Sequence, residues 1–277
     1  MITASIVVHN APVAQLSKAL HCLLGNGVDC VWILDNGGDE SLRQCCQSER
    51  IIYQHIPNNG YGAGHNVGIR QARAMGSEFH LVMNADVWWR GDVITPLAEY
   101  MRNHLDVGQM MPRVRYPDGA LQYACRMLPT PLDMFVRRFL PTCLARRHND
   151  RYLLADADHD LAFNCPYLLG SFMFFRMEAL WQVGLFDERF FLYPEDIDIT
   201  RRVHRKWLTL YYPEVEIAHE HAAASRRNFR LFTIHAVNLV RYFNKWGWFV
   251  DRERREFNRR LLRDMPRLKG ARPVARG

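Results

Sequence analysis

Residues 51–86, IIYQHIPNNGYGAGHNVGIRQARAMGSEFHLVMNAD, carry the clearest signal of the fold class. They begin with an apolar and β-branched run at 51–56 and end with a second apolar run at 79–83, followed by the tripeptide NAD. Between the two runs, a glycine-rich loop from Asn58 leads into a segment with apolar residues at helical spacing from about 66 to 75. Strand, helix and strand in this order predict a βαβ unit of a parallel sheet.

The same alternation extends toward the N-terminus. Residues 3–8 and 31–34 are short apolar runs, and residues 12–24 between them have apolar side chains at helical spacing. The second run ends at Asp35, before an Asn and two glycines that suit a sharp turn. An α/β fold with a mostly parallel sheet is therefore predicted, and such sheets bind ligands beyond the carboxyl ends of their strands. The residues placed at that edge are Asp35, the loop from Asn59, and Asp86.

The second half of the chain has a weaker pattern. Residues 112–151 are expected to be largely irregular, and residues 167–176 form an apolar run interrupted by a Gly-Ser pair. A helix is also expected in PEDIDITRRVHRKW, where acidic residues come first and basic residues follow, in agreement with the helix dipole. Further helices are expected at about 92–105, 132–139 and 177–183.

The composition is that of an ordinary globular protein. The chain has 277 residues, of which 48% are hydrophobic and 12% aromatic. No apolar run approaches the roughly 20 residues that cross a bilayer, and the first residues do not resemble a signal peptide, so a cytoplasmic protein that does not span the membrane is expected. The seven cysteines form no CxxC pair and are expected to be reduced thiols.

Basic residues concentrate in the C-terminal segment. Residues 226–277 hold 15 Lys and Arg against 4 Asp and Glu, a net charge of +11, so residues 1–225 carry −4. We therefore divide the chain into a main domain, 1–225, and a basic, aromatic helical segment, 226–277, that is expected to associate with an anionic membrane surface. A solvated end is the alternative, and nucleic-acid binding is disfavoured because the main domain has no nucleic-acid-binding motif. The aromatic residues of the segment are Tyr242, Phe243, Trp246, Trp248 and Phe249.

Two positions carry side chains that suit a divalent cation. Asp86 follows the run at 79–83, and a carboxylate at a strand end can hold a cation that bridges phosphates. His219 and His221 follow an alternating run at 214–218, so both rings would face one side of an extended chain. Turn formation by the Asp and ordinary surface histidines are the simpler alternatives.

Glu195, Asp196 and Asp198 place three carboxylates at the start of a predicted helix. A carboxylate in this position can act as a general base that takes the proton of a hydroxyl group. The alternative, which the segment alone favours, is helix capping together with ion pairs to Arg201 and Arg202.

In chain order, these segments resemble the family 2 glycosyltransferases with a GT-A fold, over about residues 3–242. The matching motifs are IVVHN in the first strand, LDN at Asp35, NNGYGAGHN from Asn58, NAD at Asp86, GSFMFFR from Gly170, and GLFDERFFLYPEDIDITRRV from Gly184. Within that family, GYGAGHN, CRMLPTPLDMFVRR from Cys125 and FFLYPEDIDI are similar to the rhamnosyltransferases of bacterial O-antigen assembly, and mycobacterial cell-wall linker rhamnosyltransferases share the pattern.

The resemblance implies a role for each motif. Asp196 would be the catalytic base, Asp35 would contact a pyrimidine base, and Asp86 with His219 would hold Mg²⁺ or Mn²⁺. The residues implied to border the nucleotide and its sugar are His9, Asn10, Asp35, Asn59, Gly60, Gly64, Asn66, Asn84 and Asp86. Those implied on the acceptor side are Gly170, Ser171 and Glu195.

The resemblance further implies an inverting transfer of L-rhamnose from dTDP-β-L-rhamnose to an undecaprenyl-diphosphate-linked GlcNAc saccharide or another oligosaccharide, in O-antigen and lipopolysaccharide synthesis at the inner face of the membrane. One departure is that the DxD metal motif of the family reads NAD here, without the first carboxylate. A UDP or GDP sugar donor is the main alternative, and a non-catalytic sugar-nucleotide-binding protein is a second. A sugar nucleotidyltransferase is disfavoured because its early glycine-rich loop with a lysine is absent.

Overall fold

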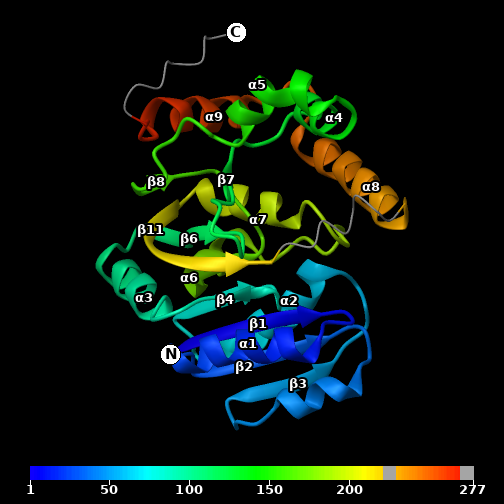
Figure 1. The fold of residues 1–277 in the computed structure, drawn as a ribbon, viewed down its shortest axis with the longest axis vertical. Helices are drawn as coiled ribbons and strands as arrows, with labels where there is room; N and C mark the ends of the chain where they lie inside the picture. Colours follow the sequence, from blue (N-terminus) through cyan, green and yellow to red (C-terminus); the bar gives the residue numbers. More distant parts are fainter. Residues whose placement is uncertain (221–228, 269–277) are drawn as a thin grey trace.

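The computed structural model of the protein describes residues 1–220 and 229–268, and a nine-stranded mixed sheet runs through this part of the chain (Figure 1). Its first four strands are parallel and hydrogen-bonded in the order β3-β2-β1-β4. They agree with the predicted runs to within one residue at each end, which confirms the α/β prediction. These strands are β1 (Ile2–Val8), β2 (Cys30–Asp35), β3 (Ile51–His55) and β4 (Phe79–Met83).

The sheet continues beyond β4 as β10-β6-β11-β5, with β10 antiparallel to both β4 and β6. These strands are β5 (Val87–Trp88), β6 (Val107–Arg115), β10 (Phe172–Arg176) and β11 (Leu208–His219). A short strand, β8 (Phe163–Asn164), pairs with β11, and β7 (Cys125–Arg126) with β9 (Tyr167–Leu168) forms a separate two-stranded sheet.

The expectation that the chain is irregular from residue 112 is wrong, because β6 extends through Pro112 to Arg115. Proline removes a backbone donor and rarely lies in a central strand. Here the register between β6 and β11 shifts just after the pair Tyr212 and Pro112, so the irregularity accommodates the proline.

Helices cover both faces of the sheet. Along β2, Val31 and Ile33 point into the apolar cluster under α1 and α3, whereas Trp32 and Leu34 point into the cluster under α2, α6 and α7. The helices are α1 (Val13–Gly25), α2 (Tyr61–Ala74), α3 (Ile94–Asn103), α6 (Met177–Val183) and α7 (Glu195–His204), with a 3₁₀ turn, η1, at Glu40–Cys45.

The helix α2 begins five residues before its predicted start, because its glycines serve helix packing. A Cβ atom on Gly64 would lie 2.7 Å from Cγ2 of Val7, and one on Gly68 would lie 2.8 Å from Cβ of Ser5. Glycine therefore lets α2 lie directly on β1, and the low helix propensity of these residues is outweighed by close packing.

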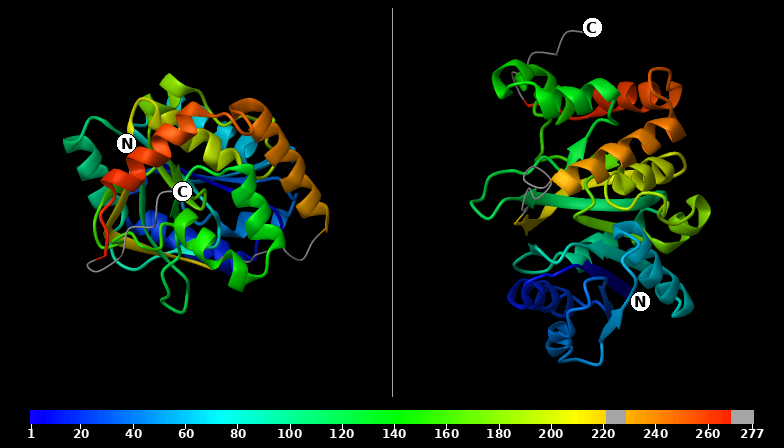
Figure 2. Two further views of the ribbon diagram at one scale, coloured as in Figure 1. Left: turned by 90° about the horizontal axis from the view of Figure 1, so that it is seen from above. Right: turned by 90° about the vertical axis from the view of Figure 1, so that its right-hand side faces the viewer.

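A third layer at one end of the molecule is made of helices far apart in sequence (Figures 1 and 2). They are α4 (Pro131–Phe139), α5 (Thr142–Tyr152), α8 (Phe229–Trp246) and α9 (Arg252–Asp264). We call residues 131–152 and 229–268, which hold these four helices and the turns between them, the helical layer. The predicted helix near 132–139 is thus confirmed, while α5 was missed because its apolar residues are few. Within the described residues no helix is long and apolar enough to cross a bilayer.

The C-terminal segment packs on the main domain instead of standing apart from it. Tyr242 and Phe243 are buried in one cluster with Tyr167 and Ile197, which corrects the expectation that the aromatic residues of the segment are together available to a membrane. Arg201 of α7 also forms a buried ion pair with Asp251, with Nη2 and Oδ1 2.7 Å apart. The predicted boundary at residue 225, and His221, lie outside the described residues.

Candidate active site

The predicted donor and acceptor segments lie side by side at the carboxyl end of β4. Phe172 of β10 is paired with Met83 of β4, and the backbone N–H of Asn84 donates to the carbonyl of Ser171 at 3.0 Å. The helix α7 begins beside this point, since the N–H of Gly170 donates to the Asp196 carboxylate. The fold thus brings together the motifs at Asn84, Gly170 and Asp196, the first and last of which are 112 residues apart in the sequence.

At the ends of β1 and β2, His9, Asn10 and Asp35 meet as predicted. A Cβ atom on Gly37 would lie 3.1 Å from the backbone N of Asn10 and 3.3 Å from Nδ1 of His9. Asp35 is buried and accepts hydrogen bonds from the N–H of Gly37 at 2.8 Å and from the hydroxyl of Tyr53 at 2.7 Å. Burial opposes ionisation, but these donors outweigh it and lower the pKa of Asp35. Asp35 therefore keeps its negative charge at this edge of the sheet, beside the turns that follow β1 and β2.

The Asn59 loop borders a cavity of about 820 Å³. Gly60 has φ +104°, and a Cβ atom there would lie 2.2 Å from the carbonyl oxygen of Phe191, so only glycine fits. Residues 188–191 of the motif that starts at Gly184 thus lie across the loop, and exposed Asn59 remains on the cavity wall. The other lining residues are Asn58, Glu188, Arg189, Phe190, Phe191, Arg241, Asn244 and Lys245.

Two residues implied to border the donor have structural roles instead. The amide of Asn66 is buried, with Nδ2 donating to the carbonyl of Phe186 and to Glu188, and Oδ1 accepting from the N–H of Phe186. Gly64 packs on Val7. These contacts correct the prediction, because they leave neither residue a polar group directed at a ligand.

Asp86 and His219 come together because β5 pairs with β11. His219 is opposite Val87 in that register, and its Nε2 lies 3.4 Å from Oδ1 of Asp86. The side-chain oxygen of Gln122 lies 2.7 Å from Nδ1 of His219, which fixes the ring with Nε2 on the side of Asp86. Carboxylate oxygens and imidazole nitrogens are both ligands of divalent cations, so the two side chains fit a cation site.

Within the described residues no cluster of three or more potential metal ligands is found, and Asp86 with His219 forms a pair. Asn84, which occupies the position of the missing carboxylate, accepts a hydrogen bond from the hydroxyl of Tyr61 at 2.8 Å. Mg²⁺ is often held by one or two protein groups together with substrate phosphates. The pair Asp86 and His219 suits that mode of binding.

Asp196 is held rigidly at the start of α7. Its Oδ2 accepts from the N–H of Gly170 at 3.0 Å and from the hydroxyl of Tyr167 at 3.3 Å, and its Oδ1 accepts from the N–H of Ile197 at 2.8 Å. Burial raises the pKa of Asp196, although these donors and the positive charge of Arg126 oppose the rise. A carboxylate with a raised pKa is a stronger base once it is ionised.

The alternative of an ion pair between Asp196 and Arg201 does not hold. The Arg201 guanidinium is turned toward α9, where it bonds Asp251 and Glu253. The cation whose charge favours ionised Asp196 is Arg126, at the end of β7. Sequence reasoning missed Arg126 because 70 residues separate it from Asp196.

Glu195, the other acid of the pair, is also buried. Burial and the charge of Asp196 raise the pKa of Glu195, so it is the member of the pair that holds a proton more readily. Among the described residues its Oε2 has no hydrogen-bond partner, and the same is true of the buried Ser171 hydroxyl. Both groups belong to the predicted acceptor side, where a sugar hydroxyl would satisfy them.

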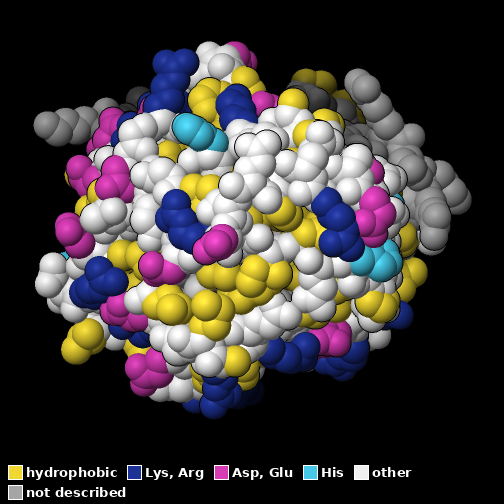
Figure 3. Space-filling view, turned by 90° about the horizontal axis from the view of Figure 1, so that it is seen from below, with side chains coloured by type: hydrophobic (Ala, Val, Ile, Leu, Met, Phe, Trp, Pro, Cys, Tyr) yellow, Lys and Arg dark blue, Asp and Glu magenta, His cyan; other side chains and the backbone are white. Residues whose placement is uncertain are grey.

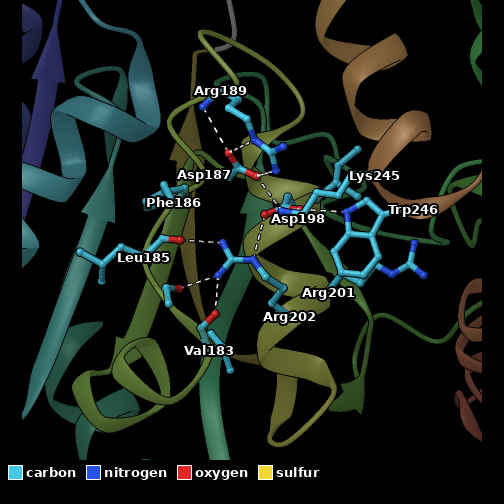
Figure 4. A network of polar contacts seen from close by, with 12 residues as sticks. Val183, Leu185, Phe186, Asp187, Arg189, Asp198, Arg201, Arg202, Lys245 and Trp246 are labelled. Carbon is cyan, nitrogen blue, oxygen red and sulfur yellow. Dashed lines mark hydrogen bonds and ion pairs between the residues drawn. The ribbon is translucent and has the colours of Figure 1, made fainter.

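Asp198, the third carboxylate of the cluster, belongs to a network of polar contacts (Figure 4). It is fully buried and paired with Arg202 at 2.9 Å and with Lys245 at 2.6 Å, and it accepts from the indole N–H of Trp246. Lys245 also pairs with Asp187 at 2.8 Å. For Asp198 the ion-pair alternative is therefore confirmed, with Arg202 as one partner.

Tyr61 is a site residue that the sequence analysis did not single out. Its hydroxyl lies 2.8 Å from Oδ1 of Asn84 and 2.9 Å from the carbonyl oxygen of Gly170, whose N–H donates to Asp196. Burial and three nearby carboxylates raise the pKa of Tyr61, so the hydroxyl keeps its proton. Tyr61 thus joins the end of β4 to the turn that holds the Asp196 carboxylate. The one sequence signal was an aromatic residue among glycines in a loop already assigned to the site.

The fold is that of a glycosyltransferase. The chain belongs to glycosyl transferase family 2, whose family model matches residues 3–184. The architecture is the GT-A fold, which confirms the predicted fold class.

Relatives of known activity support the same assignment. The N-acetylglucosaminyl-diphospho-decaprenol L-rhamnosyltransferase of Mycobacterium tuberculosis is 27% identical over 72% of this chain and 68% of its own length. Rhamnosyltransferase WbbL of Escherichia coli is 25% identical over 76% of this chain and 80% of its own length. Among solved structures, the mannosyltransferase PcManGT of Pyrobaculum calidifontis with GDP-Man and Mn²⁺ has a TM-score of 0.59 and 16% identity, over 88% of this chain and 63% of that one.

Proposed function

We propose that the protein is an inverting rhamnosyltransferase that moves L-rhamnose from dTDP-β-L-rhamnose to an undecaprenyl-diphosphate-linked saccharide of the GlcNAc type, at the inner face of the membrane. The observation that carries the proposal is the position of Asp196, whose carboxylate is fixed by the Gly170 turn beside the donor strand end at Asn84. Two relatives that are rhamnosyltransferases, one of them named for a GlcNAc-diphospho-lipid, support the donor sugar and the acceptor class.

The chemistry is a single displacement at the anomeric carbon. The acceptor hydroxyl oxygen forms the new bond to C1 while its proton passes to the Asp196 carboxylate. The bond between C1 and the diphosphate oxygen breaks, and its electron pair leaves with dTDP. Attack opposite the leaving group inverts the β donor into an α-L-rhamnoside.

The remaining residues bind and orient. A Mg²⁺ or Mn²⁺ ion held by Asp86 and His219 would neutralise charge on the diphosphate. Tyr61 keeps the Asn84 and Gly170 segments together, and Arg126 stabilises the ionised form of the base. Protonated Glu195 and the Ser171 hydroxyl offer hydrogen bonds to the acceptor sugar.

The test is transfer from dTDP-L-rhamnose, with UDP and GDP sugars in parallel, to a synthetic GlcNAc-diphosphate-lipid, with Mg²⁺, Mn²⁺ or EDTA. Rhamnose transfer that EDTA abolishes would support the donor and the cation pair together. Transfer only from a GDP or UDP sugar would overturn the rhamnosyl assignment but keep the mechanism; the likeness to a mannosyltransferase solved with GDP-Man makes GDP-mannose the first rival donor to include. Donor binding without transfer to any acceptor would favour the non-catalytic alternative.

A further inference from the structure

Charge divides the molecule into two parts. Residues 131–152 carry a net charge of +3 and residues 229–268 carry +6, so the described helical layer has +9. The remainder of the first 225 residues carries −7. The end of the molecule opposite the layer shows basic and acidic side chains interspersed (Figure 3). A basic layer on an acidic body is complementary to an anionic surface on one side only.

The same layer exposes more than half of the large apolar residues that face solvent in the described chain. Phe249 is 77% exposed and Val250 is 71% exposed, in the turn between α8 and α9, and Leu144 of α5 is 71% exposed. Isolated exposed residues of this kind need no explanation, but several on one basic layer do. The others on the layer are Leu132, Phe135, Leu140, Val237, Val240, Trp248 and Leu268.

Apolar and basic side chains share one face of α5. Leu144, Arg147 and Arg151 are three and four residues apart, so they lie on one side of the helix, and all three are exposed. Within the described residues neither arginine has a carboxylate at ion-pair distance, and the same holds for Arg252 at the start of α9. These cations are thus available to an external anion.

The α8–α9 turn is fixed to the chain just before α4. The Arg254 guanidinium donates to the carbonyls of Pro129 and Trp248, and Asn258 exchanges hydrogen bonds with the backbone of Leu128. The exposed turn is therefore a rigid part of the layer. Leu128 in turn belongs to the buried cluster that contains Tyr167, whose hydroxyl donates to Asp196. The layer accordingly lies on the acceptor side of the site.

We propose that this layer, through Phe249 and Val250 of the turn and Leu144, Arg147 and Arg151 of α5, is the surface that binds the anionic phospholipid bilayer. The apolar side chains insert among the acyl chains near the headgroups, and the arginines pair with lipid phosphates. The proposal rests on the proposed function only for the lipid-linked acceptor. It assigns membrane binding to a composite surface that includes α4 and α5, and not to the C-terminal segment alone.

Sedimentation of the full chain with vesicles tests the proposal. The protein is expected to sediment with vesicles of phosphatidylcholine and phosphatidylglycerol at low salt, and not with phosphatidylcholine alone. A cation near an anionic surface contributes about 1 kcal/mol, so Arg147→Gln with Arg151→Gln should weaken binding roughly thirtyfold. Phe249→Ser with Val250→Ser should weaken it at least tenfold. Leu105→Ser is the matched control, because Leu105 is also 71% exposed but lies just beyond α3.

Three results would overturn the proposal. They are equal binding to neutral vesicles, an equal loss in the Leu105 variant, and a dimer in solution that the Phe249 and Val250 substitutions dissociate, which would assign the surface to a second copy of the chain. Transfer to a short-chain, water-soluble acceptor separates this proposal from the catalytic one. The surface variants should keep that activity and lose transfer to an acceptor embedded in vesicles, whereas loss of both would point to a structural defect.

Discussion

Two pairs of carboxylates in the segment 187–198 have opposite environments. Asp187 and Asp198 are both paired with Lys245, and the pKa of Asp187 is lowered by Arg189 and that lysine. Glu195 and Asp196 lie between them in sequence but have no ion pair in the described chain, and burial raises the pKa of each. All four are acidic residues of one short segment, so the basic partners of Asp187 and Asp198, among them Lys245 of α8, make the difference.

The comparison distinguishes Asp187 and Asp198, whose ion pairs stabilise the fold, from Glu195 and Asp196, which we propose to act on substrate. A paired, buried carboxylate is satisfied and holds elements together. An unpaired one is kept ready for a proton, at a cost in stability that the rest of the fold must offset. A substitution at Glu195 or Asp196 should therefore mainly change activity. A substitution at Asp187 or Asp198 should mainly lower the free energy of unfolding.

The largest effect is expected for Asp196→Asn. An amide cannot take the acceptor proton, so kcat should fall roughly 10²- to 10⁴-fold while the free energy of unfolding stays within about 1 kcal/mol of the wild type. Single-turnover transfer and denaturant unfolding of the same preparation measure both quantities. If transfer persists at a substantial fraction of the wild-type rate, another residue is the base.

Asp198→Asn should lower the stability of the fold. Removing one charge from the buried network leaves Arg202 and Lys245 with fewer partners, and we expect the free energy of unfolding to fall by about 3 kcal/mol. Equilibrium denaturation measures the loss, with Asp264→Asn, in an exposed ion pair with Arg263, as the control that should change little. A loss of activity in Asp198→Asn without a loss of stability would erase the distinction between the two pairs.

Tyr61→Phe should have a smaller, kinetic effect. The variant loses the hydroxyl contacts to Asn84 and Gly170, and one hydrogen bond of about 1 kcal/mol corresponds to a fall in kcat of roughly fivefold. Initial rates over a range of donor and acceptor concentrations give kcat and KM separately. Tyr211→Phe, which removes a hydroxyl contact to the carbonyl of His159 away from the site, should leave kcat unchanged. Equal losses in both variants would reduce Tyr61 to a packing role.

The smallest effect is expected for Glu195→Gln, and it depends on pH. Because the folded state raises the pKa of Glu195, this residue favours folding at low pH, and the contribution is lost as pH rises through that raised value. Glutamine mimics the protonated acid at every pH. The Tm of the variant should match the wild type near pH 5 and exceed it by about 3 °C near pH 9. A Tm difference that does not change with pH would show that Glu195 does not titrate in this range.

The parallel half of the fold could be predicted from the sequence because each strand is a short apolar run bounded by turn residues. The strand β6 could not, since Pro112 conceals it until the register shift opposite Tyr212 is known. The early start of α2 was hidden for a related reason, because glycine normally disfavours a helix and only the contact of Gly64 with Val7 explains it.

The site was less accessible to sequence reasoning than the fold. The pair of Asp86 and His219 was expected only by resemblance, because it depends on the pairing of β5 with β11 across 130 residues. Arg201 lies five residues from Asp196 and was the natural partner in sequence, yet its side chain turns toward Asp251. Proximity along a helix does not determine which face a long side chain takes.

The division of charge described above, with +9 on the helical layer and −7 on the rest of residues 1–225, gives the molecule a large electric dipole. Such a molecule turns in the field of a charged surface before it touches it, so most encounters begin in one orientation. Because the Debye length is about 8 Å at physiological ionic strength, the torque acts over the last nanometre of approach. Added salt should therefore slow capture by a charged surface more than it speeds release, since exposed apolar contacts such as those of Phe249 are not screened.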